Sequence, residues 1–254
     1  MFKYKSSNYE QYRPNYPTSL VAFFKEQKLL KKTDLVAEFG CGTGKLTNLL
    51  LKNGNFVYGV EQDEEMQDFL SERFSANHNF CLVKKTAENS GLAKKEFDLI
   101  IAAQSFHLFN PIKAKEEFYR ILKNNGNIVL IWYHWNMNQE ISHKILNLFY
   151  TFREKQQQQE RTQIGLDFFI ELFHPNTVQH RIIDTITQKF STHEFLNSML
   201  SSSYASITND KLRTEYLDEA ENIFTQCSKN GYVEYSFNLE VYFSKIEQTN
   251  NVVA

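Results

Sequence analysis

The sequence is poor in the residues that mark disulfide-rich and metal-binding proteins. Its 254 residues include 3 cysteines, 2 tryptophans, 4 prolines and 9 glycines. The cysteines (Cys41, Cys81 and Cys227) are odd in number and widely separated, which argues against a disulfide framework and against a zinc site. We therefore expect reduced thiols, a cytoplasmic location and no bound metal.

Long apolar runs and an excess of one charge are absent as well. No run approaches the ~18 consecutive apolar residues of a membrane span, and residues 1–7 (Met-Phe-Lys-Tyr-Lys-Ser-Ser) lack the apolar segment of a signal peptide. With 28 basic and 30 acidic side chains, the formal net charge is −2 at pH 7. Because no basic field is available to bind a polynucleotide, we expect a small-molecule substrate, with neither nucleic acid nor membrane as a partner.

What the sequence does contain is a strand, a glycine turn and a helix in close succession over residues 35–50. Leu35–Phe39 is an apolar run with one carboxylate, Glu38. Leucines at helical spacing come after three glycines at alternate positions, Gly40, Gly42 and Gly44. Such a turn brings backbone N–H groups and a helix N-terminus up to a ligand. It predicts the floor of a cofactor site, although an ordinary glycine-rich turn has the same pattern.

The next strand adds an acid at the matching edge. Phe56–Val60 has the pattern of a second buried strand, and Glu61 follows it, 17 residues after Gly44. One helix and one strand fit into that interval, so Glu61 is expected at the carboxyl end of the neighbouring parallel strand. A carboxylate there can accept both hydroxyls of a ribose. The alternative is a solvated charge at the end of a strand.

Further strands and loops extend the pattern to an α/β protein. Apolar runs over Phe80–Val83 and Phe97–Ala103 predict buried strands, and the polar loops after them, residues 86–89 and 104–109, should face one crevice. A fifth strand is expected over residues 128–132. Strict alternation over residues 233–244 predicts an antiparallel strand with one wet face. The helix before the fifth strand is expected to end near Gly126, in a left-handed turn.

Two segments allow more than one interpretation. Residues 1–17 carry tyrosines, an arginine and prolines, and are expected to form either a lid over a polar ligand or an arm packed on the surface. Residues 137–180 have the pattern of a helical cap with an aromatic stripe, which fits a packed core or the wall of a substrate pocket.

His107 is the histidine with the most suggestive position. It lies among aromatic residues in the loop that follows the Phe97–Ala103 strand. An unperturbed histidine titrates near pH ~6.5, so it can accept a proton from a substrate or donate a hydrogen bond. Packing between its aromatic neighbours is the alternative role.

The order of these elements, and the Gly-x-Gly-x-Gly turn with its preceding acid, resemble the class I S-adenosylmethionine-dependent methyltransferases. A dinucleotide-binding turn more often reads Gly-x-Gly-x-x-Gly, whereas Lys45 follows Gly44 here. The small-molecule branch, with the trans-aconitate methyltransferases and other proteins of the methyltransferase type 11 domain, is similar in three segments: residues 12–17 (Tyr-Arg-Pro-Asn-Tyr-Pro), 103–109 (Ala-Gln-Ser-Phe-His-Leu-Phe) and 120–126 (Arg-Ile-Leu-Lys-Asn-Asn-Gly).

The resemblance implies a Rossmann-like α/β fold. This fold is a seven-stranded, mostly parallel sheet with an antiparallel last strand, helices on both faces and a small helical cap. A single methyltransferase domain would cover residues 1–254, with the cofactor-binding core at 34–133, the cap at 137–180 and an N-terminal lid segment at 1–17. Monomer and homodimer both remain open.

The resemblance also implies which residues bind S-adenosylmethionine: Glu38, Gly40, Gly42, Gly44, Glu61, Ala87, Glu88 and Gln104. The glycines would pass beneath the methionine part, beside Gln104, with Glu38 near its amino group. Glu61 would hold the ribose hydroxyls. The adenine would lie between the backbone of Ala87 and the carboxylate of Glu88.

The implied activity is methyl transfer to a small-molecule acceptor, through a carboxylate or a hydroxyl. His107 is the candidate base or orienting group. Arg13 and Tyr16 are candidate anchors of an anionic acceptor, because a planar guanidinium matches carboxylate geometry. Leu108 stands where close relatives often carry tryptophan, so a different pocket shape is expected. The alternatives are a nicotinamide-dependent oxidoreductase and a non-catalytic S-adenosylmethionine-binding protein.

Overall fold

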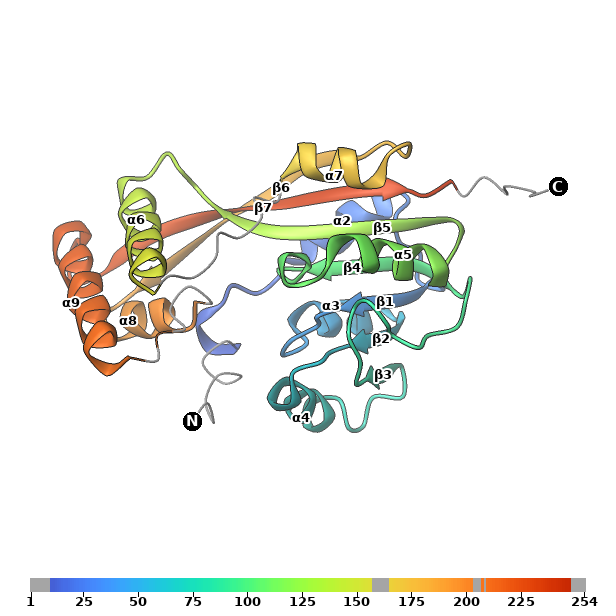
Figure 1. The fold of residues 1–254 in the computed structure, drawn as a ribbon, viewed down its shortest axis with the longest axis horizontal. Helices are drawn as coiled ribbons and strands as arrows, with labels where there is room; N and C mark the ends of the chain where they lie inside the picture. The colour runs from blue at the N-terminus through green and yellow to red at the C-terminus, as the bar shows by residue number, and fades with distance from the viewer. Residues whose placement is uncertain (1–9, 157–164, 203–206, 208, 248–254) are drawn as a thin grey trace. The chain divides into compact units, whose positions relative to one another are not determined.

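The computed structural model describes residues 10–156, 165–202, 207 and 209–247 (Figure 1). The helices in this part of the chain are α2 (Thr18–Glu26), α3 (Lys45–Asn53), α4 (Glu64–Arg73), α5 (Pro111–Ile121), α6 (Glu140–Lys155), α7 (Leu166–Phe173), α8 (Thr192–Leu200) and α9 (Asp210–Cys227), with a short 3-10 helix, η1 (Phe106–Leu108). The strands are β1 (Leu35–Phe39), β2 (Phe56–Val60), β3 (Phe80–Val83), β4 (Phe97–Ala103), β5 (Leu122–Trp135), β6 (Gln179–Phe190) and β7 (Val233–Lys245).

The strands form one seven-stranded sheet in the order β3-β2-β1-β4-β5-β7-β6. The β3–β2, β2–β1, β1–β4 and β4–β5 pairs are parallel. Near the start of β5, the N–H of Asn125 donates to Ile246 O, just after β7 (3.2 Å). Just after the end of β5, the N–H of Asn136 donates to Ser236 O, near the start of β7 (2.9 Å). The β5–β7 pair is therefore antiparallel. The expected fold class, with its antiparallel last strand, is therefore confirmed.

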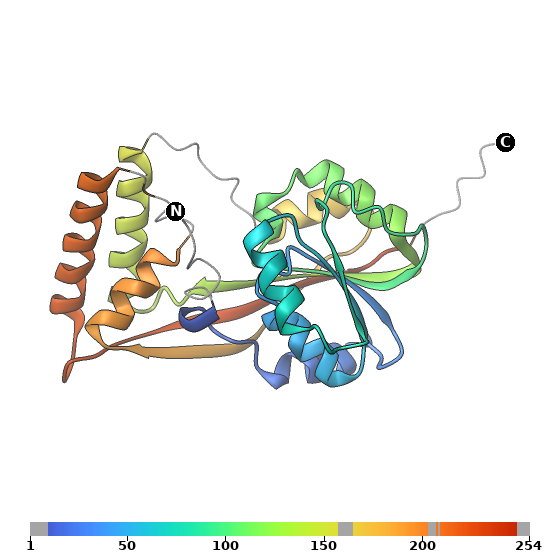
Figure 2. The same ribbon diagram turned by 90° about the horizontal axis from the view of Figure 1, so that it is seen from below.

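The strand order decides which face each helix covers. From β1 the chain moves outward through β2 to β3, then returns to β4 and continues to β5 in the opposite direction. Right-handed crossovers in opposite directions place their helices on opposite faces of a sheet. Figure 2 shows α2 and α3 on one face and α5 and α7 on the other. The direction reverses between β1 and β4, so their carboxyl ends flank the crevice where open α/β sheets bind ligands.

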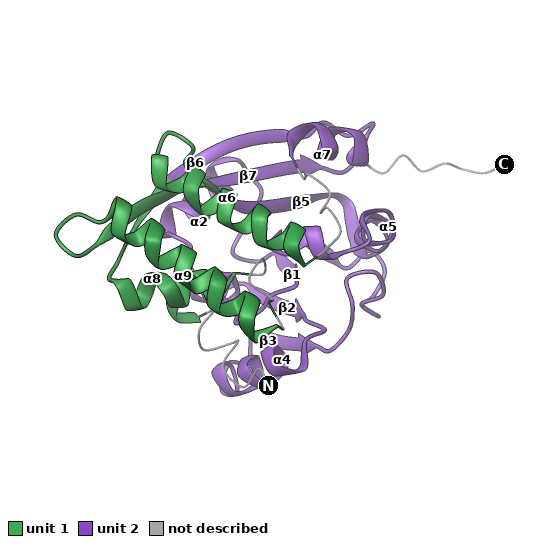
Figure 3. Ribbon diagram, turned by 60° about the vertical axis from the view of Figure 1, so that its left-hand side comes forward, with its two compact units in different colours: residues 1–14, 133–161, 185–238 green, residues 15–132, 162–184, 239–254 purple. Residues whose placement is uncertain are grey.

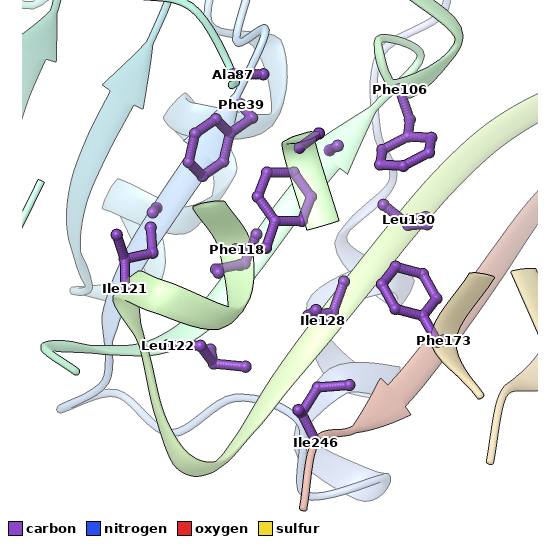
Figure 4. Packing of buried hydrophobic residues seen from close by; sticks show 14 of the residues in the cluster. Phe39, Ala87, Phe106, Phe118, Ile121, Leu122, Ile128, Leu130, Phe173 and Ile246 are labelled. Atoms are coloured by element: carbon purple, nitrogen blue, oxygen red, sulfur yellow. The ribbon is translucent and has the colours of Figure 1, made fainter. Parts of the chain in front are cut away.

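The chain divides into two compact units, shown in Figure 3. Unit 1 comprises residues 1–14, 133–161 and 185–238, and unit 2 comprises residues 15–132, 162–184 and 239–254. Each unit has its own apolar core. The core of unit 2 is built on Phe39, Phe106 and Phe118 (Figure 4), and that of unit 1 includes Phe195 and Tyr216.

The segment expected to form a cap contributes to both units. Helix α6 belongs to unit 1, whereas α7 belongs to unit 2. In α7, Phe169 and Phe173 are buried in the core of unit 2, which agrees with the core interpretation of the aromatic stripe. The cap at 137–180 and the lid at 1–17 stay predictions, and residues 1–9 lie outside the described part of the chain.

One local expectation was wrong. Gly126 does not adopt the left-handed conformation; Asn125 does, with φ of 61°. Gly126 is needed for a different reason, since a Cβ there would lie 2.6 Å from Leu122 Cγ. Strand β5 begins at Leu122, earlier than the apolar run predicts.

Candidate functional site

The glycine turn after β1 combines two packed glycines with one that faces open space. All three have positive φ: 65° at Gly40, 57° at Gly42 and 79° at Gly44. A Cβ added to Gly40 would lie 2.5 Å from Ser105 Cβ, and one on Gly44 would lie 2.5 Å from Phe74 Cε2. A Cβ on Gly42 would meet nothing within 4 Å. The backbone at Gly42 is therefore the part of the turn that a ligand can approach.

Glu61 joins this turn to the end of β2. Its Oε2 accepts the N–H of Gly42 at 2.9 Å, and its Oε1 accepts the N–H groups of Gln62 and Asp63, both at 2.9 Å. The side chain is 7% exposed. A carboxylate has about four lone-pair sites, so acceptor capacity remains for further donors such as hydroxyl groups.

Glu38 lies buried at the end of β1, with 2% exposure. Thr47 in the first turn of α3 donates its hydroxyl to Glu38 Oε2 at 2.6 Å. Burial raises the pKa of Glu38 to about 8; the Thr47 hydrogen bond opposes this rise and the Glu61 charge adds to it. This carboxyl group therefore changes protonation near neutral pH in the folded protein.

The loop after β4 packs directly on the glycine turn. Ser105 donates its hydroxyl to the carbonyl of Phe39 at 2.7 Å, immediately before Gly40. Gln104 precedes Ser105 with φ of 57°, and its backbone N–H bonds Ile131 O at 2.9 Å. Among the described residues, its side-chain Nε2 is buried and has no hydrogen-bond partner. An unmet buried donor costs about 1–3 kcal/mol, so this amide is poised to donate to a ligand.

The loop after β3 is tied to α5 at two places. Glu88 Oε1 accepts the backbone N–H of Asn110, the residue that caps α5, at 2.8 Å. Glu117 in α5 accepts both the N–H (2.9 Å) and the hydroxyl of Ser90. Ala87, between these contacts and β3, is buried in the core of unit 2.

Glu117 is itself held by an arginine. Arg120 donates to Glu117 Oε2 at 2.6 Å through Nε and to the carbonyl of Leu92 at 2.7 Å through Nη2. Glu117 is 6% exposed. Burial acts to raise its pKa, but the hydrogen bonds from Arg120 and Ser90 outweigh burial and lower the pKa below the ordinary value.

The three predicted catalytic residues do not all fall in one unit. Unit 2 contains His107, which is half-buried in η1, and Tyr16. Asn15, next to Tyr16, accepts a hydrogen bond from Lys45 Nζ at 2.8 Å, which places this segment beside the end of the glycine turn. Arg13 belongs to unit 1, where its Nη2 donates to Ser201 O at 3.1 Å. The catalytic roles stay predictions.

Sequence reasoning missed the residues that support the turn from outside it. Besides Thr47 and Ser105, Arg73 at the end of α4 donates to the carbonyl of Thr43 at 2.9 Å. A hydroxyl in the first turn of the helix after the glycines, as at Thr47, is a signal that could have been used. The partners of Ser105 and Arg73 lie 66 and 30 residues away, and no local pattern points to them.

Two features common in other enzymes and transporters were not found. Within the described ranges, no group of three or more His, Cys, Asp or Glu side chains is placed to hold a metal ion. No described helix is both long and apolar enough to cross a bilayer.

Comparison with known proteins adds a family match to this geometry. Residues 37–130 match the sequence model of a family described as a methyltransferase domain. An uncharacterized methyltransferase-like protein of Schizosaccharomyces pombe is 33% identical over 132 residues, which cover 52% of this chain and 50% of that protein. The chain thus spans about half the length of the curated relatives it matches.

Solved structures extend the likeness to nearly the whole chain at the level of the fold. A putative methyltransferase from an antibiotic biosynthesis pathway of Anabaena variabilis has a TM-score of 0.63 at 19% identity, over 92% of this chain and 99% of that one. The phosphoethanolamine N-methyltransferase 2 of Haemonchus contortus, solved with phosphomonomethylethanolamine and S-adenosylhomocysteine, has a TM-score of 0.60 at 14% identity, over 97% and 58%. At these identities the likeness shows a shared fold.

Proposed function

We infer that this chain is a class I S-adenosylmethionine-dependent methyltransferase. The observation that carries the inference is the contact between Gly42 and Glu61: an open glycine backbone and a carboxylate meet at the carboxyl ends of β1 and β2. This contact lies inside the segment that matches the methyltransferase domain family. The glycine spacing and the family match both go against a nicotinamide-dependent oxidoreductase.

The residues of unit 2 fit S-adenosylmethionine by the chemistry of their free groups. The backbone at Gly42 has open space beside it for the methionine part. The unpartnered Nε2 of Gln104 offers a donor, which the carboxylate of that part can accept. Glu38 offers a carboxyl oxygen that can accept from the amino group, and Glu61 keeps an acceptor site for a ribose hydroxyl. Ala87 and Glu88 are left for the adenine.

The cofactor supplies an electrophilic methyl group, so the demands on the protein are modest. Its residues must orient the acceptor and exclude water from the site. We assign the orienting or proton-accepting role to His107. A hydroxyl acceptor requires such a base, whereas a carboxylate acceptor does not.

The acceptor is proposed to be a small anionic molecule, as in the trans-aconitate methyltransferases that residues 12–17 and 103–109 resemble. In unit 1 the positive charge of Arg13 lies close enough to the buried phenols of Tyr216 and Tyr235 to act on the pKa of both. The planar guanidinium of Arg13 offers donors that suit a carboxylate. Arg13 and Tyr16, which belong to different units, stay candidate acceptor anchors on the ground of the sequence resemblance alone.

A direct test compares two ligands on the purified chain. Titration calorimetry with S-adenosylhomocysteine should give a saturable heat, and the same titration with NADH should give none. Transfer of a labelled methyl group from S-adenosylmethionine into a small-molecule cell extract should then follow. Binding of NADH alone would overturn the cofactor assignment, and binding without any transfer would favour a non-catalytic binder.

A further inference from the structure

We propose that Glu88 is a positioning residue that couples occupation of the adenine pocket to the loop that carries His107, through its bond to Asn110. The proposal rests on the function inferred above. It assigns Glu88 a second role, beyond contact with the adenine, in fixing the segment between η1 and α5.

The coupling begins with a single hydrogen bond between two loops. Glu88 Oε1 accepts the backbone N–H of Asn110 at 2.8 Å, across 22 residues of sequence. Asn110 is the N-cap of α5, and its own side chain accepts the N–H of Lys113 at 3.1 Å. Glu88 therefore holds the backbone at the point where the His107 loop ends and α5 begins.

The other side of the Glu88 loop is firmly anchored. Two residues further on, Ser90 gives both its N–H and its hydroxyl to Glu117, which is buried and also bound by Arg120. A charge-assisted network of this kind holds Ser90 against the middle of α5. Because Ser90 is fixed, Glu88 has little freedom except in the rotation of its own side chain.

From Asn110 the contacts lead back to the glycine turn. Phe109, the preceding residue, lies against the turn: a Cβ on Gly40 would be 3.3 Å from Phe109 Cζ. Its ring also packs edge-on against Phe106, with 5.8 Å between ring centroids. Phe106 and Phe109 flank His107 in the sequence. A displacement of Asn110 therefore moves Phe109, whose ring lies against the floor of the cofactor site.

A bound cofactor should strengthen the bond between Glu88 and Asn110. In the absence of ligand, Glu88 is half-buried and its bond to Asn110 competes with water. A carboxylate has enough lone pairs to accept an adenine amine and the Asn110 N–H together. An adenine that covers the carboxylate excludes water and lowers the local dielectric, which makes the remaining bond stronger. Linkage then requires that an ordered Asn110 favours cofactor binding in return.

The test measures hydrogen exchange at the Asn110 amide with S-adenosylhomocysteine as the probe. In the wild-type chain, saturation with the probe should slow exchange at Asn110 by about tenfold or more, as expected for a strengthened bond to a charged acceptor. In Glu88→Ala, titrated with enough probe to saturate its weakened site, the amide should exchange rapidly with and without the probe. Glu88→Gln, which keeps a side-chain oxygen, should restore part of the protection.

Glu116→Ala is the matched control, because Glu116 is an exposed carboxylate on the same helix as Glu117. This variant should behave as the wild type in both states. Probe-induced protection of Asn110 that survives in Glu88→Ala would overturn the proposal, as would wild-type exchange that is unchanged when the probe is bound. A wild-type chain that does not bind the probe at all would instead refute the inferred function.

Discussion

The backbone N–H of Gly42 donates to Glu61 Oε2 over 2.9 Å, so the turn after β1 is bonded directly to the carboxylate after β2. The contact has consequences for both binding and folding. Glu61 accepts three backbone N–H groups in total, and these would otherwise lose their partner in a partly buried setting.

Replacement of Glu61 by alanine should weaken binding of S-adenosylhomocysteine by roughly 100-fold, because a charge-assisted hydrogen bond to the ribose is lost. The loss of its backbone contacts should also lower the free energy of unfolding by about 1–3 kcal/mol, which leaves the chain folded. Calorimetric titration and denaturant unfolding measure the two effects. Glu64→Ala, which removes an exposed acid three residues after Glu61, serves as control. Unchanged affinity in Glu61→Ala would refute the ribose assignment.

Alanine at Gly40 and at Gly42 should have different effects. Both positions have positive φ, which costs an L residue about 1–2 kcal/mol. At Gly40 the new methyl group also meets Ser105 at 2.5 Å, so the main effect should be a lower melting temperature. At Gly42 it enters open space, so the main effect should be lost cofactor affinity. Equal effects of the two substitutions on affinity would contradict the assignment of Gly42 as the open face.

The buried carboxyl of Glu38 should make stability depend on pH. Its pKa of about 8 lies above the ordinary value of 4.5, so between these values the folded chain binds more protons than the unfolded chain. The stabilisation is fully present below pH 4.5 and is lost as pH rises through 8. Glu38→Gln stays neutral at every pH. Relative to this variant, the free energy of unfolding of the wild type should fall by on the order of a few kcal/mol as pH rises over this interval.

Denaturant unfolding of both proteins at pH 6 and pH 9 measures this difference. Glu38→Gln keeps an oxygen that can accept the Thr47 hydroxyl, so the comparison isolates the titration of one group. Stability differences that are the same at both pH values would contradict the raised pKa.

Much of the fold could be predicted from sequence patterns that each span about ten residues or fewer. The apolar run at Leu35–Phe39, the alternate glycines and the acid after Phe56–Val60 each specify a local structure, and together they place Glu61 beside the turn. The proximity of Glu61 to the glycine turn was predictable because the carboxyl ends of neighbouring parallel strands lie side by side at one edge of the sheet.

The contacts that support the site were not predictable in the same way. Arg73 bonds the carbonyl of Thr43, Ser105 bonds that of Phe39, and Glu88 bonds the amide of Asn110. A backbone carbonyl or amide is present at every residue, so its partner leaves no mark in the sequence. The division of residues 137–180 between two units has a related cause, because apolar helical spacing shows that α6 and α7 are buried but not against which core.

The unpartnered amide of Gln104 leads to a prediction in which stability and binding separate. Gln104→Met removes a buried donor that has no partner among the described residues and replaces it with an apolar group of similar length. The free energy of unfolding should stay the same or rise by about 1 kcal/mol, whereas affinity for S-adenosylhomocysteine should fall about tenfold. A loss of stability with unchanged affinity would show that the amide serves the fold instead.

His107→Ala should lower methyl transfer far more than it lowers cofactor affinity. A positioned general base or orienting group contributes about 10²–10⁴ to a rate, while the proposed cofactor contacts lie on Glu38, the glycine turn and Glu61. The measurement is transfer of labelled methyl from S-adenosylmethionine into a small-molecule extract, together with calorimetric titration of S-adenosylhomocysteine. Ile112→Ala is the matched control, because Ile112 is 59% exposed in the nearby helix α5 and has no group that can move a proton. Wild-type turnover in His107→Ala would exclude the base and leave packing as the role of this histidine.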